Sequence, residues 1–284
     1  MFPIRRNDLP ALAWDDFVLR STDGWFFHTE AWIEYSLAYT PGSTDSSHAF
    51  ATDNGNVSGV WPTVLGASGV TLVNGGQEPV APIGDCAGKA IGGYSHRPRR
   101  KTDVDTGSRE TFVVDLTQPP KELWRQLRGS YKPLINRASR ELTLETASNR
   151  SHDSIKSDLV MSAALAIHTE ASGRQTRSDR TWQLQSQWLS DGRATCVLAS
   201  RNGTAIAFAY ALTWKGWAYY FSSASLEDDV LHALVWELMM ASAASGCRYF
   251  ELGHVAHDGD SDKEKGISFF KSGFGGDVWE IPRG

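Results

Sequence analysis

The segment from residue 195 to residue 252 limits the possible folds most, because it combines two hairpin turns with one long apolar run. Three runs within it are expected to form strands: Thr195–Ser200, Ala205–Trp214 and Trp217–Ser222. Asn202-Gly203 and Lys215-Gly216 separate these runs and favour tight turns between antiparallel strands. Leu226–Ala244 has the length of a helix, and Tyr249–Leu252 has the composition of a buried strand. The segment therefore predicts mixed α/β structure around an antiparallel meander.

The rest of the second half alternates strands and helices around this meander. Further strands are expected at Thr111–Leu116, Leu142–Thr146 and Val278–Ile281. Helices are expected at Lys121–Leu127, Tyr131–Glu141, His152–Thr169 and Thr181–Leu189. A short helix is also expected within Gly266–Gly276. From residue 111 the predicted order is β-α-β-α-α-β-β-β-α-β-α-β.

The first part is shorter and less regular. Helices are expected at Leu12–Leu19 and at Glu30–Tyr39, which Thr29 can cap. His48–Thr52 and Val57–Leu65 read as strands joined by the turn Asp53-Asn54-Gly55-Asn56, and Val70–Val73 reads as another strand. The glycine-rich region Asn74–Gly93 matches no nucleotide-binding pattern, and His96–Gly107 has the polar character of a linker.

Length and composition place the chain among ordinary soluble proteins. Its 284 residues suffice for two domains, expected at 1–110 and 111–284. No apolar run reaches the length of a membrane span, and no secretory signal is visible. Three isolated cysteines, Cys86, Cys196 and Cys247, indicate a reducing cytoplasm without a disulfide framework or a structural zinc site. A net charge of −5 argues against a protein coated in basic surface but permits a local basic patch.

Lys271 is the first candidate for chemistry, because phenylalanines surround it in the sequence. Phe269, Phe270 and Phe274 flank this lysine, and three glycines follow within five positions. A lysine in such surroundings either extends its ammonium to water or is held in a pocket for a purpose. A short helix with a glycine cap is the structural alternative.

A basic stretch from Lys121 to Arg140 is the second candidate. Its cations are Lys121, Arg125, Arg128, Lys132, Arg137 and Arg140. The first four would share one helical face if Gly129 and Pro133 did not interrupt the helix. Such a face suits a phosphate-rich partner, and an ordinary solvated face is the alternative.

Covalent catalysis has little support in the sequence. There is no G-x-S-x-G motif, and no cysteine has an evident histidine partner. His254 and His257 follow the strand that ends near Leu252, but their spacing on a loop defines no metal geometry, so no metal is expected. Positioning of two substrates with electrostatic stabilisation of an oxyanion remains.

Several motifs resemble the Fem aminoacyltransferases. They are Phe26–Trp32, Val113–Leu116 with Leu123-Trp124 and Ile135–Ala138, and Phe250–Gly253 followed by Gly266–Gly275. The resemblance implies an α/β (α+β) fold of two acetyltransferase-like (GNAT) domains, with mixed sheets flanked by helices. It also implies transfer of an aminoacyl group from the acceptor end of aminoacyl-tRNA, as co-substrate and without another cofactor, to a free amine. The chain would act as a cytoplasmic monomer.

The resemblance also implies roles for particular residues. Lys271 and Phe270 match the catalytic pair, and the lysine would steady the leaving group and the oxyanion. Arg177 and Trp182 match the acceptor-binding region, together with Trp32 and Glu34 in the first domain. The basic residues Arg125, Arg128, Lys132 and Arg137 suit the tRNA.

One departure from the family pattern concerns the acceptor. Members that use nucleotide-linked muropeptides carry a lysine two residues after the first-domain tryptophan, whereas this chain has Glu34 there. A carboxylate would repel a diphosphate. The departure favours a small peptide or peptidyl-nucleoside acceptor, such as a peptide antibiotic intermediate, over a peptidoglycan interpeptide bridge.

Two further functions stay open. The first is an N-acyltransferase that uses acyl-CoA, although Ser222–Ser225 replaces the usual glycine-rich pyrophosphate loop. The second is a non-catalytic module that binds an acidic ligand around Lys271.

Overall fold

The computed structural model describes residues 2–22, 24–52, 56–66, 71–74, 98–100, 109–148 and 154–281. The chain divides into two compact units, Met1–Ser108 with Glu280–Gly284, and Arg109–Trp279. The last five residues thus group with the first unit, whereas the sequence analysis assigned them to the second. Cys86, Arg97, Lys101 and the turn 53–55 lie outside the described residues, as does most of the glycine-rich region.

The first unit contains two small sheets and short helices. Its helices are η1 (Arg6–Asp8), α1 (Ala13–Arg20), η2 (Phe26–His28) and α2 (Glu30–Tyr39). One sheet has the order β1 (Phe2–Arg5), β3 (His48–Ala51), β4 (Val57–Trp61), and the other β2 (Thr44–Asp45), β5 (Thr63–Leu65), β6 (Thr71–Asn74). Another short strand, β7, covers Arg99–Arg100.

Two local sequence signals explain much of this unit. Helix α2 has the predicted bounds, and the Thr29 hydroxyl accepts a hydrogen bond of 3.3 Å from the Trp32 backbone N–H. The single strand expected at Val57–Leu65 is instead two strands. Pro62 lies between them, and proline has no N–H to donate to a strand partner.

The second unit is built on one mixed sheet with the order β14-β8-β13-β12-β11-β10-β9. Its strands are β8 (Arg109–Asp115), β9 (Thr143–Ser148), β10 (Ala194–Arg201), β11 (Thr204–Trp214), β12 (Trp217–Ser225), β13 (Tyr249–His254) and β14 (Asp277–Ile281). Strands β10 to β12 form the predicted antiparallel meander, β9 pairs antiparallel with β10, and β12 and β13 are parallel.

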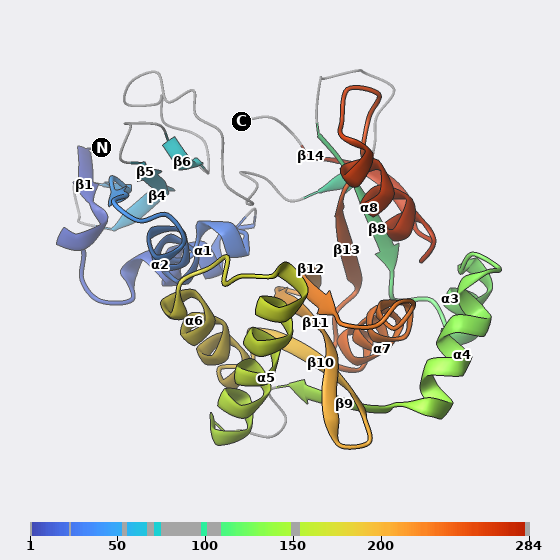
Figure 1. The fold of residues 1–284 in the computed structure, drawn as a ribbon. Helices are drawn as coiled ribbons and strands as arrows, with labels where there is room; N and C mark the ends of the chain where they lie inside the picture. Colours follow the sequence, from blue (N-terminus) through green and yellow to red (C-terminus); the bar gives the residue numbers. More distant parts are fainter. Residues whose placement is uncertain are drawn as a thin grey trace. The chain divides into compact units, whose positions relative to one another are not determined.

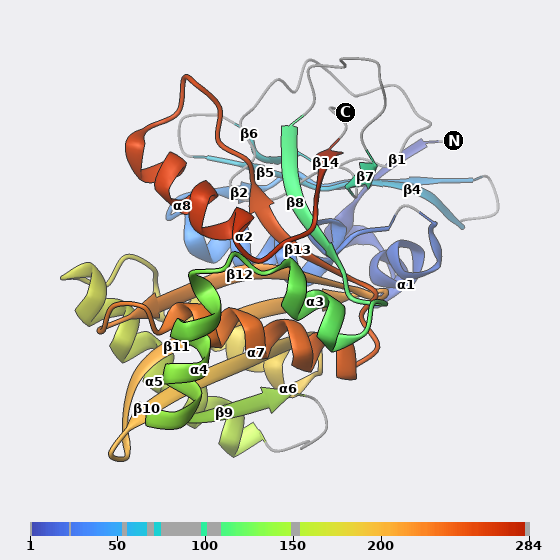
Figure 2. The ribbon, with the colours of Figure 1, turned by 90° about the vertical axis from the view of Figure 1, so that its right-hand side faces the viewer.

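Helices cover both faces of this sheet (Figures 1 and 2). They are α3 (Pro120–Gln126), α4 (Tyr131–Glu141), α5 (Ser154–Ser172), α6 (Asp179–Ser190), α7 (Leu231–Ala244) and α8 (Asp262–Ser272). Helix α7 packs on β10 and β11 with α4 outside it, and α5 and α6 pack on the opposite face. Alternation along β11 supports both layers: Ala207 and Ala209 face the α7 core, whereas the Tyr210 hydroxyl donates to the Gln185 carbonyl of α6.

Two helix starts differ from the sequence predictions. Helix α7 begins at Leu231 rather than Leu226, because Leu226–Val230 forms a loop in which Asp229 has a positive φ of 66°. Helix α8 begins at Asp262, four residues before Gly266. Ser261 caps it, and Ser261 and Glu264 exchange hydrogen bonds in a capping box.

Gly276 offers a test of this packing, because it lies against β8 with a φ of +87°. A Cβ at this position would be 2.4 Å from the Val113 carbonyl oxygen. Gly173, with a φ of +68° and open space around it, is the matched control. We expect Gly173→Ala to lower the free energy of unfolding by about 1–2 kcal/mol and Gly276→Ala by about 1–3 kcal/mol more. If urea unfolding gave the same loss of unfolding free energy for both variants, the close contact of Gly276 with β8 would be contradicted.

Candidate active site

The candidate site begins where β12 and β13 separate. Their parallel pairing covers three residue pairs, the last of which is Tyr219 with Glu251. The register between β13 and β8 shifts between Glu251 and Gly253, and Gly253 has a φ of +90°. This is a β-bulge, which bends a strand and redirects its side chains. The sheet therefore opens just beyond Tyr219 and Glu251.

Lys271 extends from the last turn of α8 into this opening. Its Nζ lies 2.9 Å from the position that a Cβ would occupy at Gly253. The Tyr219 hydroxyl lies 4.0 Å from the same point. Glycine at position 253 thus leaves the space that the ammonium fills. In the described part of the chain, no hydrogen-bond acceptor or ion-pair partner contacts Nζ.

Glu251 supplies negative charge beneath this lysine. Its side chain is fully buried, and the Thr111 hydroxyl donates a hydrogen bond of 2.9 Å to its Oε1. Burial lowers the pKa of Lys271 to about 8, and the charge of Glu251 acts in the opposite direction. The ammonium is therefore largely protonated at pH 7 although it is desolvated.

Phe270 packs against a cluster of rings from α4, α7 and the segment just after α8. Its ring packs against Tyr131, His232 and Phe274, with centroids 6.1, 5.1 and 5.1 Å away. The Tyr131 hydroxyl donates to the Phe270 carbonyl at 2.9 Å. These contacts anchor the end of α8 against α4 and α7. They give Phe270 a positioning role, and direct contact with substrate stays a prediction.

Arg177 approaches β12 farther along the same strand. Its guanidinium donates to the Ser222 hydroxyl at 3.3 Å, and its Cζ lies 5.8 Å from the Phe221 ring centroid. The rings of Phe221 and Tyr219 are 6.4 Å apart. Two aromatic rings of β12 therefore connect the surroundings of Arg177 with those of Lys271.

Trp182 packs beside Arg177, and its predicted contact with an acceptor stays a prediction. The Arg177 Cζ lies 5.7 Å from its ring, and the His168 ring lies 5.3 Å from it. Trp182 is buried, and its Nε1–H has no hydrogen-bond acceptor among the described residues. Burial, reinforced by the charge of Arg177, lowers the pKa of His168, so this imidazole is neutral at pH 7.

The predicted basic face is divided. Helices α3 and α4 are separate, and Arg128 lies in the turn between them. The Arg125 guanidinium pairs with Glu122 at 2.7 Å, and that of Arg137 pairs with Asp229 at 3.2 Å. The Lys132 ammonium donates to the Arg125 carbonyl at 3.4 Å. The basic stretch is therefore not one continuous helix, as the interruption at Gly129 indicated, and contact of these four residues with tRNA stays a prediction.

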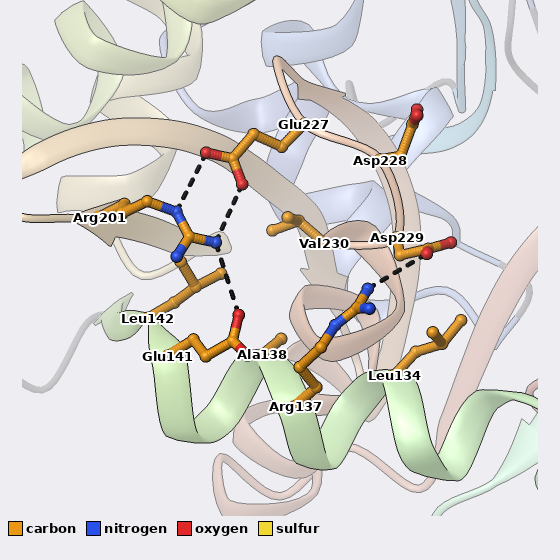
Figure 3. A pocket seen from close by; sticks show the side chains of 10 residues that line it. All are labelled: Leu134, Arg137, Ala138, Glu141, Leu142, Arg201, Glu227, Asp228, Asp229 and Val230. Carbon is orange, nitrogen blue, oxygen red and sulfur yellow. Dashed lines mark hydrogen bonds and ion pairs between the residues drawn. The ribbon is translucent and has the colours of Figure 1, made fainter.

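A charged cavity of about 260 Å³ lies beside Arg137 (Figure 3). Its charged lining residues are Arg137, Glu141, Arg201, Glu227, Asp228 and Asp229. The Arg201 guanidinium holds Glu227 through two hydrogen bonds of 3.1 and 3.0 Å. Four carboxylates and two guanidinium groups make this cavity a poor site for a phosphate.

The two first-unit residues have different surroundings. Trp32 belongs to the core, where its ring lies 4.6 Å from Phe27 and stacks on Tyr35 at 5.2 Å. Glu34 is exposed. Packing explains Trp32 without a ligand, and acceptor contacts at both residues stay predictions.

The loop histidines are held by a carboxylate. Asp260 Oδ2 bonds to the His254 ring at 3.0 Å and accepts from the His257 backbone N–H at 2.8 Å. No group of three potential metal ligands occurs among the described residues. Within the described ranges, no helix has both the length and the hydropathy to span a membrane.

Three contributors were missed from the sequence. Tyr219, Phe221 and His168 belong to the site region, but no motif marks them. Alternation along the strand would have grouped Tyr219 with Phe221. Their relation to Glu251 depends on the register of a parallel pair, which has no sequence signal as clear as a hairpin turn.

Comparisons with known proteins identify the fold. No protein-family model matches the chain, and no curated protein matches its sequence. The crystal structure of FemX matches with a TM-score of 0.63 and 14% identity over 99% of this chain and 96% of that one. A tandem GNAT protein from the clavulanic acid biosynthesis pathway matches with a TM-score of 0.47 and 12% identity, covering 98% and 95%. The C-terminal domain of a putative lysylphosphatidylglycerol synthetase from Agrobacterium fabrum gives 0.41 and 19%, covering 62% and 60%. The match to FemX shows the fold alone: the chain has the expected mixed α/β architecture and a FemX-like fold.

The charge balance at Lys271 can be measured directly. Removal of the Glu251 charge by Glu251→Gln should lower the pKa of Lys271 further, because only the desolvation would remain. Competitive acetic anhydride labelling across pH, read by mass spectrometry, should give a pKa near 8 for the unaltered chain and a lower value for the variant. Thr111→Val, which removes the hydroxyl bonded to Glu251 but keeps its charge, is the control and should have the smaller effect. Indistinguishable labelling curves for Glu251→Gln and the unaltered chain would contradict the assignment.

Proposed function

We propose that this protein is an aminoacyltransferase that moves an aminoacyl group from aminoacyl-tRNA to a free amine and forms a peptide bond. The observation that carries the proposal is Lys271, a desolvated ammonium with no hydrogen-bond partner among the described residues. An ester under attack by an amine develops negative charge on its carbonyl oxygen. A fixed cation in a poorly solvated site stabilises that charge.

The reaction needs no covalent enzyme intermediate. A neutral amine attacks the ester carbonyl, a C–N bond forms, and the C–O bond to the ribose breaks. The amine gives up a proton and the leaving ribose oxygen takes one. The enzyme has to hold the two substrates together and stabilise the oxyanion, which Lys271 does in this proposal.

Arg177 suits an anionic group of the acceptor. Its guanidinium donates to Ser222 and lies near the rings of Trp182 and Phe221. Two rings of β12, those of Phe221 and Tyr219, lie between Arg177 and the surroundings of Lys271. A guanidinium in a fixed orientation binds carboxylate or phosphate with little further ordering. The proposed acceptor is a small peptide or peptidyl-nucleoside of secondary metabolism, because Glu34 disfavours a nucleotide diphosphate.

The loop before α7 argues against a CoA donor. A helix N-terminus commonly binds a pyrophosphate through backbone N–H groups. Here Glu227, Asp228 and Asp229 precede α7, and their carboxylates would repel a pyrophosphate. Acyl-CoA is therefore the alternative donor that the assay below compares with charged tRNA.

The donor assay compares two sources of the acyl group. Purified protein is incubated with a pool of charged tRNA and a peptide that has a free amine, and mass spectrometry detects the product. We expect RNase-sensitive transfer from the charged pool and none from acetyl-CoA. Acylation by acetyl-CoA without RNase-sensitive transfer would overturn the proposal.

Lys271→Met tests the oxyanion role. We expect kcat to fall by about 10²–10³, the usual effect of removing one such group, with the thermal midpoint preserved. Lys265→Met, on the exposed side of the same helix, should leave kcat unchanged. Because the cationic form acts, the rate of the unaltered enzyme should decline as the pH rises through about 8. An unchanged kcat in Lys271→Met would remove Lys271 from the mechanism.

A further inference from the structure

The last turns of α8 carry a second notable feature, the ring of Phe269 with the guanidinium of Arg128 over it. The Arg128 Cζ lies 3.7 Å from the centroid of the Phe269 ring, so the guanidinium covers one face of that ring. Its NH1 donates to the Tyr131 hydroxyl at 3.1 Å, and its NH2 donates to the Ser272 hydroxyl at 2.9 Å. The Arg128 backbone N–H also donates to the Gly273 carbonyl at 2.8 Å. Three hydrogen bonds therefore fix the position of this cation.

Phe269 is unusually exposed for an aromatic residue at this place. Its relative exposure is 66%, although it lies two residues before Lys271. No other aromatic ring contacts it among the described residues. The anchoring of α8 does not need this ring, because Tyr131 already holds the Phe270 carbonyl and Phe274 is fully buried. Apart from its contact with Arg128, Phe269 packs against no aromatic ring of the described part of the second unit.

Arg128 also retains a free charge. In the described part of the chain it makes no ion pair with a carboxylate, unlike Arg125 and Arg137. Its two side-chain hydrogen bonds go to neutral hydroxyls, and several of its five N–H donors remain available. A planar aromatic ring with an uncompensated planar cation on it matches a nucleobase and its neighbouring phosphate.

We propose that Phe269 and Arg128 form a stacking site for a nucleobase in the single-stranded 3′ end of the donor RNA. This inference rests on the proposed function, which brings that end to Lys271. Phe269 stacks on the base, and Arg128 orients the ring and contacts a phosphate. The site selects unpaired RNA, because a base within a duplex does not expose its face.

The test uses two RNA hairpins, one with a single-stranded CCA 3′ end and one that lacks those three nucleotides. We expect the unaltered protein to prefer the CCA hairpin. Phe269→Ala should weaken its binding by about 5- to 100-fold, the range for one stacked base, and should remove the preference. Phe269→Trp should retain both the affinity for the CCA hairpin and the preference for it. Leu159→Ala is the matched control, since Leu159 on α5 is 67% exposed and should not affect binding.

The outcomes separate this inference from the proposed function. If the unaltered protein prefers the CCA hairpin but Phe269→Ala keeps that affinity and preference, the stacking site is wrong and the tRNA donor stands. If the unaltered protein shows no preference and transfer is insensitive to RNase, the tRNA donor is wrong and the stacking site fails with it. If Phe269→Leu binds as well as Phe269→Trp, general apolar contact replaces stacking and overturns the inference.

Discussion

The separation of β12 and β13 is the constraint on which the candidate site depends. Paired strands lie about 4.8 Å apart, which leaves no room for a side chain between them. The pairing of β12 with β13 stops after Tyr219 and Glu251. The bulge at Gly253 bends β13 and shifts its register with β8. A side chain from α8 can then enter the opening. Without the glycine, a Cβ would occupy a position 2.9 Å from the Lys271 ammonium.

The electrostatics of Lys271 are a balance between two opposing effects. Desolvation favours the neutral amine, and the buried carboxylate of Glu251 favours the ammonium. A direct ion pair would hold the proton more firmly, but it would also occupy the ammonium. Here Thr111 bonds to the carboxylate, while no acceptor among the described residues contacts Nζ. The positive charge of Lys271 is thus maintained by a carboxylate that does not contact Nζ.

Local signals in the sequence predicted most elements of the second unit. The turns at Asn202-Gly203 and Lys215-Gly216 determined the meander, because each glycine takes a positive φ that the turn requires. The predicted start of α7 was wrong, because the spacing of Leu226 and Val230 continues the apolar pattern of the helix. In the structure these residues and the three carboxylates between them form a loop, in which Asp229 has a positive φ. Tertiary context decides such boundaries.

The site itself was only partly predictable. Lys271 was singled out because lysine among phenylalanines conflicts with ordinary burial preferences. Arg177 and Trp182 were placed by resemblance, and the structure brings them together. Tyr219 was missed, because its relation to Gly253 follows from a parallel register and from a bulge. Glu251 was included only as part of the motif Phe250–Gly253, and its partner Thr111 lies 140 residues away in the sequence.

The charged side chains of the second unit are unevenly distributed around α7 and α8. Arg125 and Arg137 are paired with carboxylates, and acidic residues dominate the cavity before α7. Arg128 lacks such a partner in the described chain, and it bonds to Ser272, the residue next to Lys271. A field of this kind attracts phosphate at the end of α8 and repels it beside α7. The carboxylates therefore concentrate beside α7, whereas the Arg128 guanidinium, which has no ion pair among the described residues, lies at the end of α8.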